Sequence, residues 1–156
     1  MIINNFIITD KEEDEVFQFG VNLPGATYTN GKITSIKQTN STSDSPFFDV
    51  CRYGLTYVRL DDCVTVGTSA FMSYRELVSA DLPACTSIGW YAFERCSALT
   101  TVNAPACTYI GESAFISCSA LTSANFPLCT TIGERAFKYC SALSLINFPA
   151  CTSIGL

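Results

Sequence analysis

The chain has 156 residues, nine of them cysteine and none histidine, and its formal net charge is −5 at pH 7. A hydrophobic content of 48% is enough for one packed domain and excludes a disordered chain. The acidic balance and the scattering of the nine lysine and arginine residues disfavour nucleic acid or an anionic membrane as a partner.

The N-terminal stretch, residues 1–9, is apolar but short, has no preceding positive region, and runs into an acidic cluster at residues 10–15. This is not the pattern of a secretory signal, and no stretch approaches the roughly 20 apolar residues of a membrane span. We therefore expect no membrane insertion and a cytoplasmic or virion-associated location, unless export uses another route or a leader has been removed. The acidic cluster is interpreted as a solvated loop, because the ligand spacing of a calcium loop is missing.

Residues 16–36 have the composition of strands, and Asn30-Gly31 between two strand-like runs predicts a β-hairpin. Ile33 and Ile36 are in phase with the repeat that follows, so the second hairpin strand is predicted to be the first rung of a solenoid sheet. Residues 1–53 are then an N-terminal β cap with a degenerate first repeat, which covers the open end of the solenoid.

Residues 54–156 are organised by a tandem repeat of 22 residues that needs no gaps. Several independent columns of residues stay in phase: Gly67, Gly89, Gly111, Gly133 and Gly155; Phe71, Phe93, Phe115 and Phe137; Pro83, Pro105, Pro127 and Pro149; Cys63, Cys85, Cys107, Cys129 and Cys151; and Cys96, Cys118 and Cys140. One unit cannot bury its apolar residues alone, whereas stacked units share a continuous core. The period therefore predicts a repeat solenoid of about five coils.

Within one unit, Val102 and Ala104 lie two residues apart and point to the same, buried face of a short strand. Residues 107–110 form a second, shorter extended piece, and Gly111 is expected to take a turn conformation closed to other residues. A short helical or 3-10 turn then carries Phe115 inward. If this placement is right, Phe115→Ala costs about 3–5 kcal/mol of stability. The predicted fold class is a solenoid of short parallel β-strands and short helical turns.

The repeat pattern Leu-Thr-Ser-Val-x-Phe/Leu-Pro-x-Cys-Thr-Ser-Ile-Gly-x-x-Ala-Phe-x-x-Cys-Ser-x resembles the BspA-like class of leucine-rich repeats, common in surface proteins of gut bacteria and some protists. The resemblance covers about residues 55–156 and is specific, because Ile-Gly-x-x-Ala-Phe-x-x-Cys recurs in phase. The usual unit of the family is one residue longer, so this is a 22-residue variant with a tighter corner. The resemblance implies a leucine-rich-repeat fold, a habit of binding other macromolecules and the cell surface as an alternative location. It brings no catalytic residues.

Eight of the nine cysteines fall in the two cysteine columns, with Cys51 the exception. Residues of one column stack above one another, an odd number cannot all pair, and no Cys-x₂-Cys spacing occurs, so free buried thiols are predicted in place of disulfides or a metal site. Without histidine there is no Ser-His or Cys-His dyad. The closest acidic pair, Asp61-Asp62, is expected to diverge at a turn. We therefore expect no enzyme and no cofactor.

Positions that vary between units predict where a partner binds. The residues after each column glycine and column phenylalanine vary freely and are expected to face solvent, and aromatic and arginine side chains are favoured at interface hot spots. The predicted partner-binding residues are Trp90, Tyr91, Glu94, Arg95, Glu112, Ile116, Glu134, Arg135, Lys138 and Tyr139. The competing interpretation is ordinary drift at unconstrained surface positions. A second candidate surface is the outward strand face, which holds Ser79, Thr101, Ser123 and Leu145 with Asp81, Asn103, Asn125 and Asn147 beside them. The asparagine side chains alternatively bond along the stack as structural groups.

The last unit ends at residues 154–156 without its Ala-Phe turn and without a polar capping unit. Either the chain belongs to a longer array, or another subunit covers this end, which would make a homo-oligomer. The leading function is a non-enzymatic module that binds a protein or glycan partner in adhesion. The alternative is a structural subunit of an assembly, such as a phage or virion surface protein or a self-associating polymer.

Overall fold

The structure, a computed structural model, describes residues 26–29, 32–36, 56–60 and 63–155. Two strands belong to the predicted N-terminal region, β1 (Ala26–Thr29) and β2 (Lys32–Ile36), and they pair antiparallel as a hairpin. The hairpin prediction is thus confirmed. The remainder of the predicted cap, the acidic cluster at residues 10–15, Cys51 and the Asp61-Asp62 pair lie outside the described residues.

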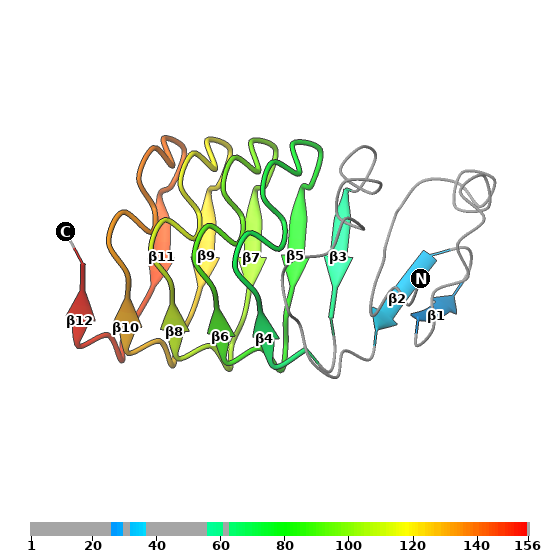
Figure 1. Cartoon of the computed structure of the whole chain (residues 1–156), viewed down its shortest axis with the longest axis horizontal. Coiled ribbons are helices and arrows are strands. Elements are labelled where there is room, and N and C mark those ends of the chain that lie inside the picture. Colours follow the sequence, from blue (N-terminus) through cyan, green and yellow to red (C-terminus); the bar gives the residue numbers. More distant parts are fainter. Residues whose placement is uncertain (1–25, 30–31, 37–55, 61–62, 156) are drawn as a thin grey trace.

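Among the described residues, β1 and β2 form a two-stranded sheet of their own, and the larger sheet begins at β3 (Tyr57–Arg59) (Figure 1). The prediction that β2 is the first rung of the solenoid sheet is therefore wrong. The hairpin register shifts between Thr27 and Tyr28. Such an irregularity strengthens local twist, which does not suit the even, parallel ladder of the solenoid.

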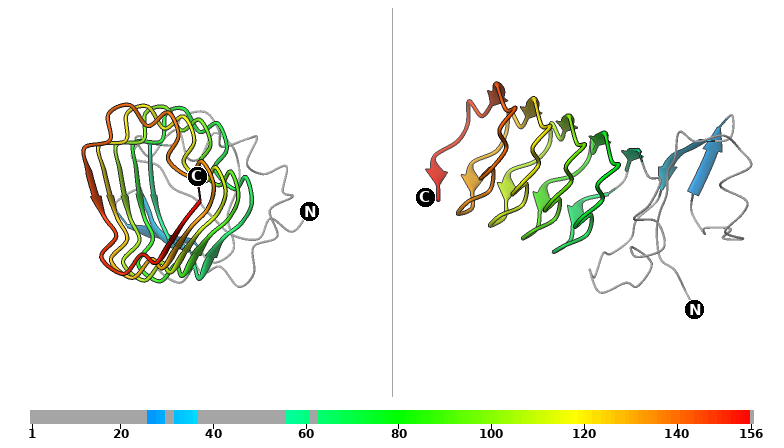
Figure 2. Two further views of the ribbon diagram at one scale, coloured as in Figure 1. Left: turned by 90° about the vertical axis from the view of Figure 1, so that its left-hand side faces the viewer. Right: turned by 90° about the horizontal axis from the view of Figure 1, so that it is seen from above.

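From residue 56 onward the chain coils into a solenoid in which each repeat contributes one strand to each of two parallel sheets (Figure 1, Figure 2). The first sheet contains β3, β5 (Ser79–Asp81), β7 (Thr101–Asn103), β9 (Ser123–Asn125) and β11 (Leu145–Asn147). The second contains β4 (Thr65–Val66), β6 (Ser87–Ile88), β8 (Tyr109–Ile110), β10 (Thr131–Ile132) and β12 (Ser153–Ile154). Every residue of these ten strands pairs with its equivalent one repeat away, as Val102 does with Ala124. The predicted solenoid and its gapless register are confirmed.

The predicted helical turns are absent: the described residues contain no helix, and consecutive β-turns occupy these positions. In one coil, Ala114 N–H donates to the carbonyl of Gly111, and Cys118 N–H donates to that of Phe115, each closing a four-residue turn. Ser113 and Ser117 lie at the third position of these turns with φ of 53° and 63°. Because every fourth residue has a left-handed backbone, no run of right-handed residues is long enough to form a helix.

These turns form a third hydrogen-bonded side of the solenoid. The N–H groups of Ser113, Phe115 and Ser117 donate to carbonyl oxygens of the following coil at 2.9, 2.8 and 2.8 Å. Because the left-handed backbone directs alternate N–H groups to the same side, all donors of this turn ladder face the C-terminal neighbour. The left-handed positions recur in each coil: Ser69, Ser73, Tyr91, Arg95, Ser113, Ser117, Arg135 and Tyr139.

The core contains a continuous stack of phenylalanine rings between the turn side and the sheets. Phe71, Phe93, Phe115 and Phe137 lie face to face with centroids 5.0, 5.1 and 5.2 Å apart and planes within 9° of parallel. Phe93 and Phe115 are completely buried. The inward placement of this column is confirmed, and its spacing is close to the roughly 4.8 Å between neighbouring strands.

The glycine column is explained by contact between coils, not by backbone conformation. None of Gly89, Gly111, Gly133 and Gly155 has φ in the left-handed region, so the expected special turn conformation is wrong. A Cβ at Gly111 would lie 2.7 Å from the carbonyl carbon of Gly89 and 2.8 Å from the backbone nitrogen of Trp90. Successive coils approach so closely at this corner that only hydrogen fits.

The cysteine columns line the core at two corners. Cys96 and Cys118 are buried and donate their S–H groups to the carbonyls of Phe71 and Phe93, both at 3.0 Å. In the other column, Cys107 donates to the carbonyl of Tyr109 at 3.2 Å. All eight described cysteines carry free thiols. Small side chains with weak donors therefore satisfy carbonyl groups where the chain changes direction.

Candidate binding surface

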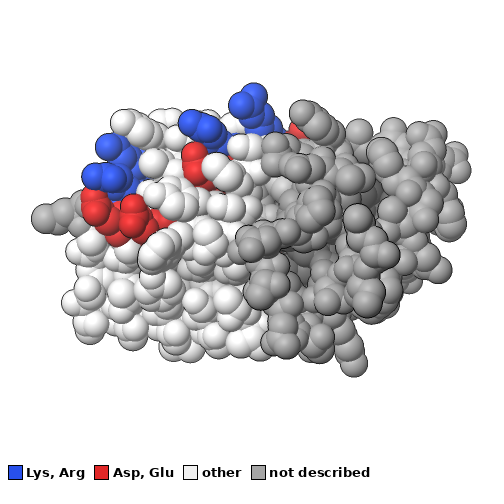
Figure 3. Space-filling view, in the orientation of Figure 1, with Lys and Arg blue, Asp and Glu red and all other residues white. Residues whose placement is uncertain are grey.

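All ten predicted partner-binding residues lie on one side of the solenoid, in the turns at residues 89–96, 111–118 and 133–140. This side, which we call the turn edge, joins the end of each second-sheet strand to the next first-sheet strand. Figure 3 shows that the charged side chains of the visible face gather along the upper part of the molecule, where these turns lie in Figure 1. The solenoid thus brings together residues that are separated by up to two repeats.

Exposure differs among these ten residues. Trp90 and Tyr139 expose 52% and 65% of their surface. Four charged residues are also exposed: Arg95, Glu134, Arg135 and Lys138. The remaining four are half-buried: Tyr91, Glu94, Glu112 and Ile116. The strongest candidates for direct contact are therefore these six exposed residues.

Four of the ten residues, Tyr91, Arg95, Arg135 and Tyr139, occupy left-handed backbone positions. In the interior coils, the hydrogen bonds of the turn ladder fix this backbone conformation. The N–H groups of Tyr91 and Arg95, for example, donate to the carbonyls of Glu112 and Ile116. Large side chains are unusual at such positions, where glycine or asparagine is favoured. Bulky aromatic and cationic groups are therefore presented from a rigid backbone despite its conformational cost.

The ion pairs of the turn edge join sequence neighbours. Arg135 contacts Glu134 at 2.7 Å, and Arg95 contacts Glu94 at 3.5 Å. The Lys138 ammonium lies 5.0 Å from the centroid of the Tyr139 ring. The Arg135–Glu134 pair is exposed on both sides and contributes only about 0–1 kcal/mol, so these two side chains are free to rearrange toward a partner at little cost.

An aromatic cluster joins two successive coils at the corner between the second sheet and the turn edge. The indole Nε1 of Trp90 donates to the hydroxyl oxygen of Tyr109 at 3.3 Å. Tyr109 exposes 36% of its surface, and sequence reasoning did not include it. A usable signal was present, because Tyr109 is the one aromatic residue in an outward strand column that otherwise holds Thr65, Ser87, Thr131 and Ser153.

The second candidate surface is the outward face of the first sheet. Its asparagine side chains bond to one another along the stack, which is the structural role named as the alternative to partner binding. Asn147, Asn125 and Asn103 each donate a side-chain amide hydrogen to the preceding residue of the column, over 3.0, 3.4 and 2.9 Å. The chain ends at Asp81, whose other oxygen pairs with Arg59 at 2.7 Å. These amides already bond along the stack, which leaves fewer of their hydrogen-bonding groups for a ligand.

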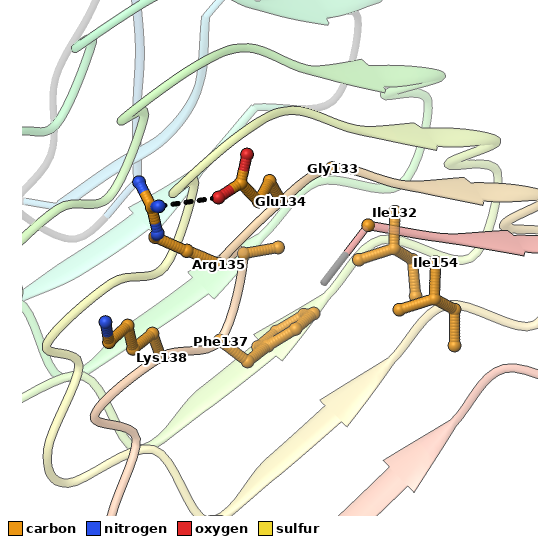
Figure 4. A pocket seen from close by; sticks show the side chains of 9 residues that line it. Ile132, Gly133, Glu134, Arg135, Phe137, Lys138 and Ile154 are labelled. Carbon is orange, nitrogen blue, oxygen red and sulfur yellow. Dashed lines mark ion pairs between the residues drawn. The ribbon is translucent and has the colours of Figure 1, made fainter.

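The last described coil forms a shallow groove (Figure 4). Phe137, Ile132 and Ile154 lie on its apolar side, whereas Glu134, Arg135 and Lys138 extend toward the other side. In an interior coil the corresponding groove is filled by the turn of the next repeat. The groove is thus the surface that one repeat offers to another.

Within the described residues, no group of three or more histidine, cysteine or acidic side chains is placed to hold a metal ion. The search of the same residues for a helix long and apolar enough to span a membrane also finds none.

Two parallel sheets of short strands, a glycine corner and a stacked aromatic core define a leucine-rich-repeat solenoid. Residues 41–156 match the family described as BspA type leucine rich repeat region, in 6 copies. The chain therefore belongs to the BspA-type leucine-rich repeat family, as the resemblance of its repeat indicated.

Two solved structures are similar to the chain. One is a leucine-rich repeat protein of T. pallidum, with a TM-score of 0.60 and 28% identity over 64% of this chain and 51% of that one. The other is a leucine-rich cell surface protein of Faecalibacterium prausnitzii, with a TM-score of 0.63 and 26% identity over 85% of this chain and 36% of that one. The chain thus spans about half or less of the length of these relatives. The search of curated proteins finds no match.

Proposed function

We propose that this chain is a non-enzymatic binding module of the adhesion type, and that its turn edge contacts a protein or glycan partner. The observation that carries this proposal is the separation of roles around each coil. Residues that face the core repeat almost unchanged, whereas the turn edge gathers Trp90, Tyr139 and four exposed charged residues on one rigid surface. Aromatic and arginine groups on a preorganised backbone are favoured in interfaces, because little conformational entropy is lost on binding.

A cell-surface location is part of the proposal. The F. prausnitzii relative is described as a cell surface protein, and adhesion requires exposure to an external partner. A surface module needs a rigid scaffold, and the three hydrogen-bonded sides of each coil supply one.

The chemistry of the described thiols also favours binding over catalysis. Burial raises the pKa of Cys63 and of Cys107 from 9.0 to about 12 in each case. A thiol is a nucleophile as thiolate, so these side chains stay protonated and unreactive at neutral pH. Their role is to fill the core.

The test compares two variants with matched numbers of substitutions on an array of purified extracellular proteins and glycans. In the edge variant, Arg95, Arg135 and Tyr139 are replaced by Asn, which tolerates a left-handed backbone, and Lys138 by Ala. The control variant replaces exposed residues away from the turn edge, Val64→Thr, Thr86→Ser, Leu128→Thr and Thr152→Ser.

We expect wild-type and control proteins to bind the same array component and the edge variant to lose at least about tenfold in affinity, as for the loss of one hot spot. Equal binding by all three proteins, with unchanged thermal unfolding, would place the contact elsewhere and contradict the proposal.

A further inference from the structure

The side chain of Trp90 lies against the backbone of the next coil at Gly111. A Cβ at Gly111 would be 2.7 Å from the indole Cδ1, so the missing side chain at this glycine makes room for the ring. Trp90 nevertheless leaves 52% of its surface exposed. One part of the indole is therefore supported by protein, while another part faces water. The exposed part of the indole is an apolar aromatic face that a ligand can cover.

Tyr109 fixes the orientation of the indole. Its hydroxyl oxygen accepts the hydrogen bond from Trp90 Nε1 at 3.3 Å, so the hydroxyl hydrogen of Tyr109 remains available as a donor. Ser87 and Thr131 lie on either side of Tyr109 in the strand ladder and add hydroxyl groups to the same outward column. The aromatic pair is thus bordered by neutral polar groups.

Glu112 supplies an acceptor on the same coil as Tyr109. It follows Gly111 directly, and its Oε1 accepts a hydrogen bond from the hydroxyl of Tyr91 at 3.4 Å. A carboxylate has further acceptor sites, so this contact holds Glu112 in place without using its full capacity. The hydroxyl donor of Tyr109 and the carboxylate acceptor of Glu112 therefore both belong to the coil against which the exposed indole lies.

We propose that Trp90, Tyr109 and Glu112 form a saccharide subsite, in which the C–H face of a pyranose ring lies on the exposed indole. The ring hydroxyls donate to Glu112 and accept from Tyr109, which matches the paired donors and acceptors of neighbouring sugar hydroxyls. This inference rests on the proposed binding function and names the chemistry of one part of that surface. It places the sugar contact at the corner with the second sheet, and not at the cationic part of the turn edge.

A cationic ligand would use the same indole face, but the surrounding charge does not favour it. In the turn that follows Trp90, the charges of Glu94 and Arg95 are paired at 3.5 Å. A neutral ligand that gains from dispersion and several hydrogen bonds fits this setting better than an ammonium or guanidinium group, which needs an excess of negative potential.

The chain offers a direct reporter, because Trp90 is its one tryptophan. Its fluorescence is followed while the full chain is titrated with xylo-, cello-, manno- and chito-oligosaccharides, and separately with tetramethylammonium and N-acetyl-argininamide. We expect at least one oligosaccharide class to change the emission saturably, with an affinity unaffected by about 0.5 M NaCl, since neutral ligands are not screened. The two cations should cause no saturable change.

Two conservative variants then test the polar contacts. Tyr109→Phe and Glu112→Gln keep the size of each side chain, and each should weaken oligosaccharide binding by about 3- to 10-fold, the effect of one lost or weakened hydrogen bond. Tyr57→Phe, which changes the outward face of the other sheet, is the matched control and should bind as the wild type does.

The subsite is overturned if no oligosaccharide changes the emission saturably, if only the cations do so, or if the Tyr109 and Glu112 variants bind like the control. If the array partner still requires the turn edge in that case, the proposed function stands and the saccharide assignment alone fails.

Discussion

The isoleucine column compares the interior of the solenoid with its last described coil. Ile88 and Ile110 are completely buried and Ile132 exposes 4% of its surface, whereas Ile154 exposes 65%. The four residues have the same position in their repeats and pair in the same ladder. Their burial therefore depends on the following coil, and each repeat completes the core of the one before it.

The turn ladder shows the same contrast in hydrogen bonds. The N–H groups of Ser113 and Ser117 donate to the next coil, whereas the equivalent groups of Arg135 and Tyr139 have no acceptor among the described residues. All N–H donors of this ladder face the following coil. If the last coils of two chains packed against each other, the N–H groups of one chain would face the N–H groups of the other and form no hydrogen bonds. Self-association through this end stays a prediction, and light scattering over a concentration series under reducing conditions tests it. A constant monomer mass would contradict it.

The largest expected loss of stability comes from truncating a buried phenylalanine, and it is compared with the truncation of a less buried one. Phe115→Ala should lower the free energy of unfolding by about 3–5 kcal/mol, since a completely buried ring is removed from a stack. Phe148 is half-buried in the last coil, so Phe148→Ala should cost about 1–2 kcal/mol. Urea unfolding measures both. Equal costs would mean that the exposure of the last coil does not exist in solution.

A second pair of variants adds one methyl group at the glycine corner. Gly111→Ala should destabilise the chain by about 1–3 kcal/mol, because the new Cβ meets the rigid backbone of Gly89 and Trp90. Gly155→Ala meets Glu134 in the same way, but the last coil is free to shift outward. Its cost should therefore stay below about 1 kcal/mol. A larger effect at Gly155 than at Gly111 would reverse the comparison.

A third test addresses the left-handed turn positions of the interior. Ser117→Val should cost about 1–2 kcal/mol, because a β-branched residue strongly disfavours φ of 63°. Ser117→Gly should be neutral or slightly stabilising. Ser119→Val, at an exposed position with ordinary φ in the same coil, is the control and should change stability by less than about 0.5 kcal/mol. Thermal unfolding that ranks Ser119→Val as the more harmful would refute the assignment.

The smallest effects concern thiol reactivity. Burial raises the pKa of Cys63 and Cys107 to about 12, so at pH 8 their thiolate fractions fall well below that of an ordinary thiol. Cys151 in the last coil is only half-buried. Iodoacetamide should therefore label Cys151 before Cys63 and Cys107 in the native protein, as followed by mass spectrometry. Simultaneous labelling, with the chain still folded, would contradict the burial of the interior column.

The fold was largely predictable because the chain provides its own alignment. Comparing repeats with one another identified the strands, the phenylalanine column and both cysteine columns, since a residue type that recurs in phase marks a fixed environment. The hairpin at Asn30-Gly31 followed from local turn preference. The turn signal lies within a few residues and the column signal lies in the 22-residue period, so both can be read from the sequence alone.

The errors arose where contacts between coils override local preference. Gly111 lacks a side chain because Gly89 and Trp90 approach it, a contact that no single unit reveals. Serine at positions 113 and 117 does not indicate a left-handed backbone from sequence alone. The hydrogen bonds of the turn ladder keep Ser113 and Ser117 in this conformation, although the local sequence favours a helical turn. Tyr109 lies outside the variable positions after each glycine and phenylalanine, and its partner Trp90 comes from the previous coil, so no single unit reveals the pair.

The gapless register has a consequence for how such a gene can change. From β3 onward, every strand residue pairs with its equivalent one period away, as Ser79 does with Thr101 and Thr101 with Ser123. Removal or duplication of one whole period between interior coils therefore joins surfaces that already fit each other. Unequal recombination within the coding sequence would lengthen or shorten the solenoid without a new fold, whereas the gain or loss of a single codon would disturb every rung that it touches.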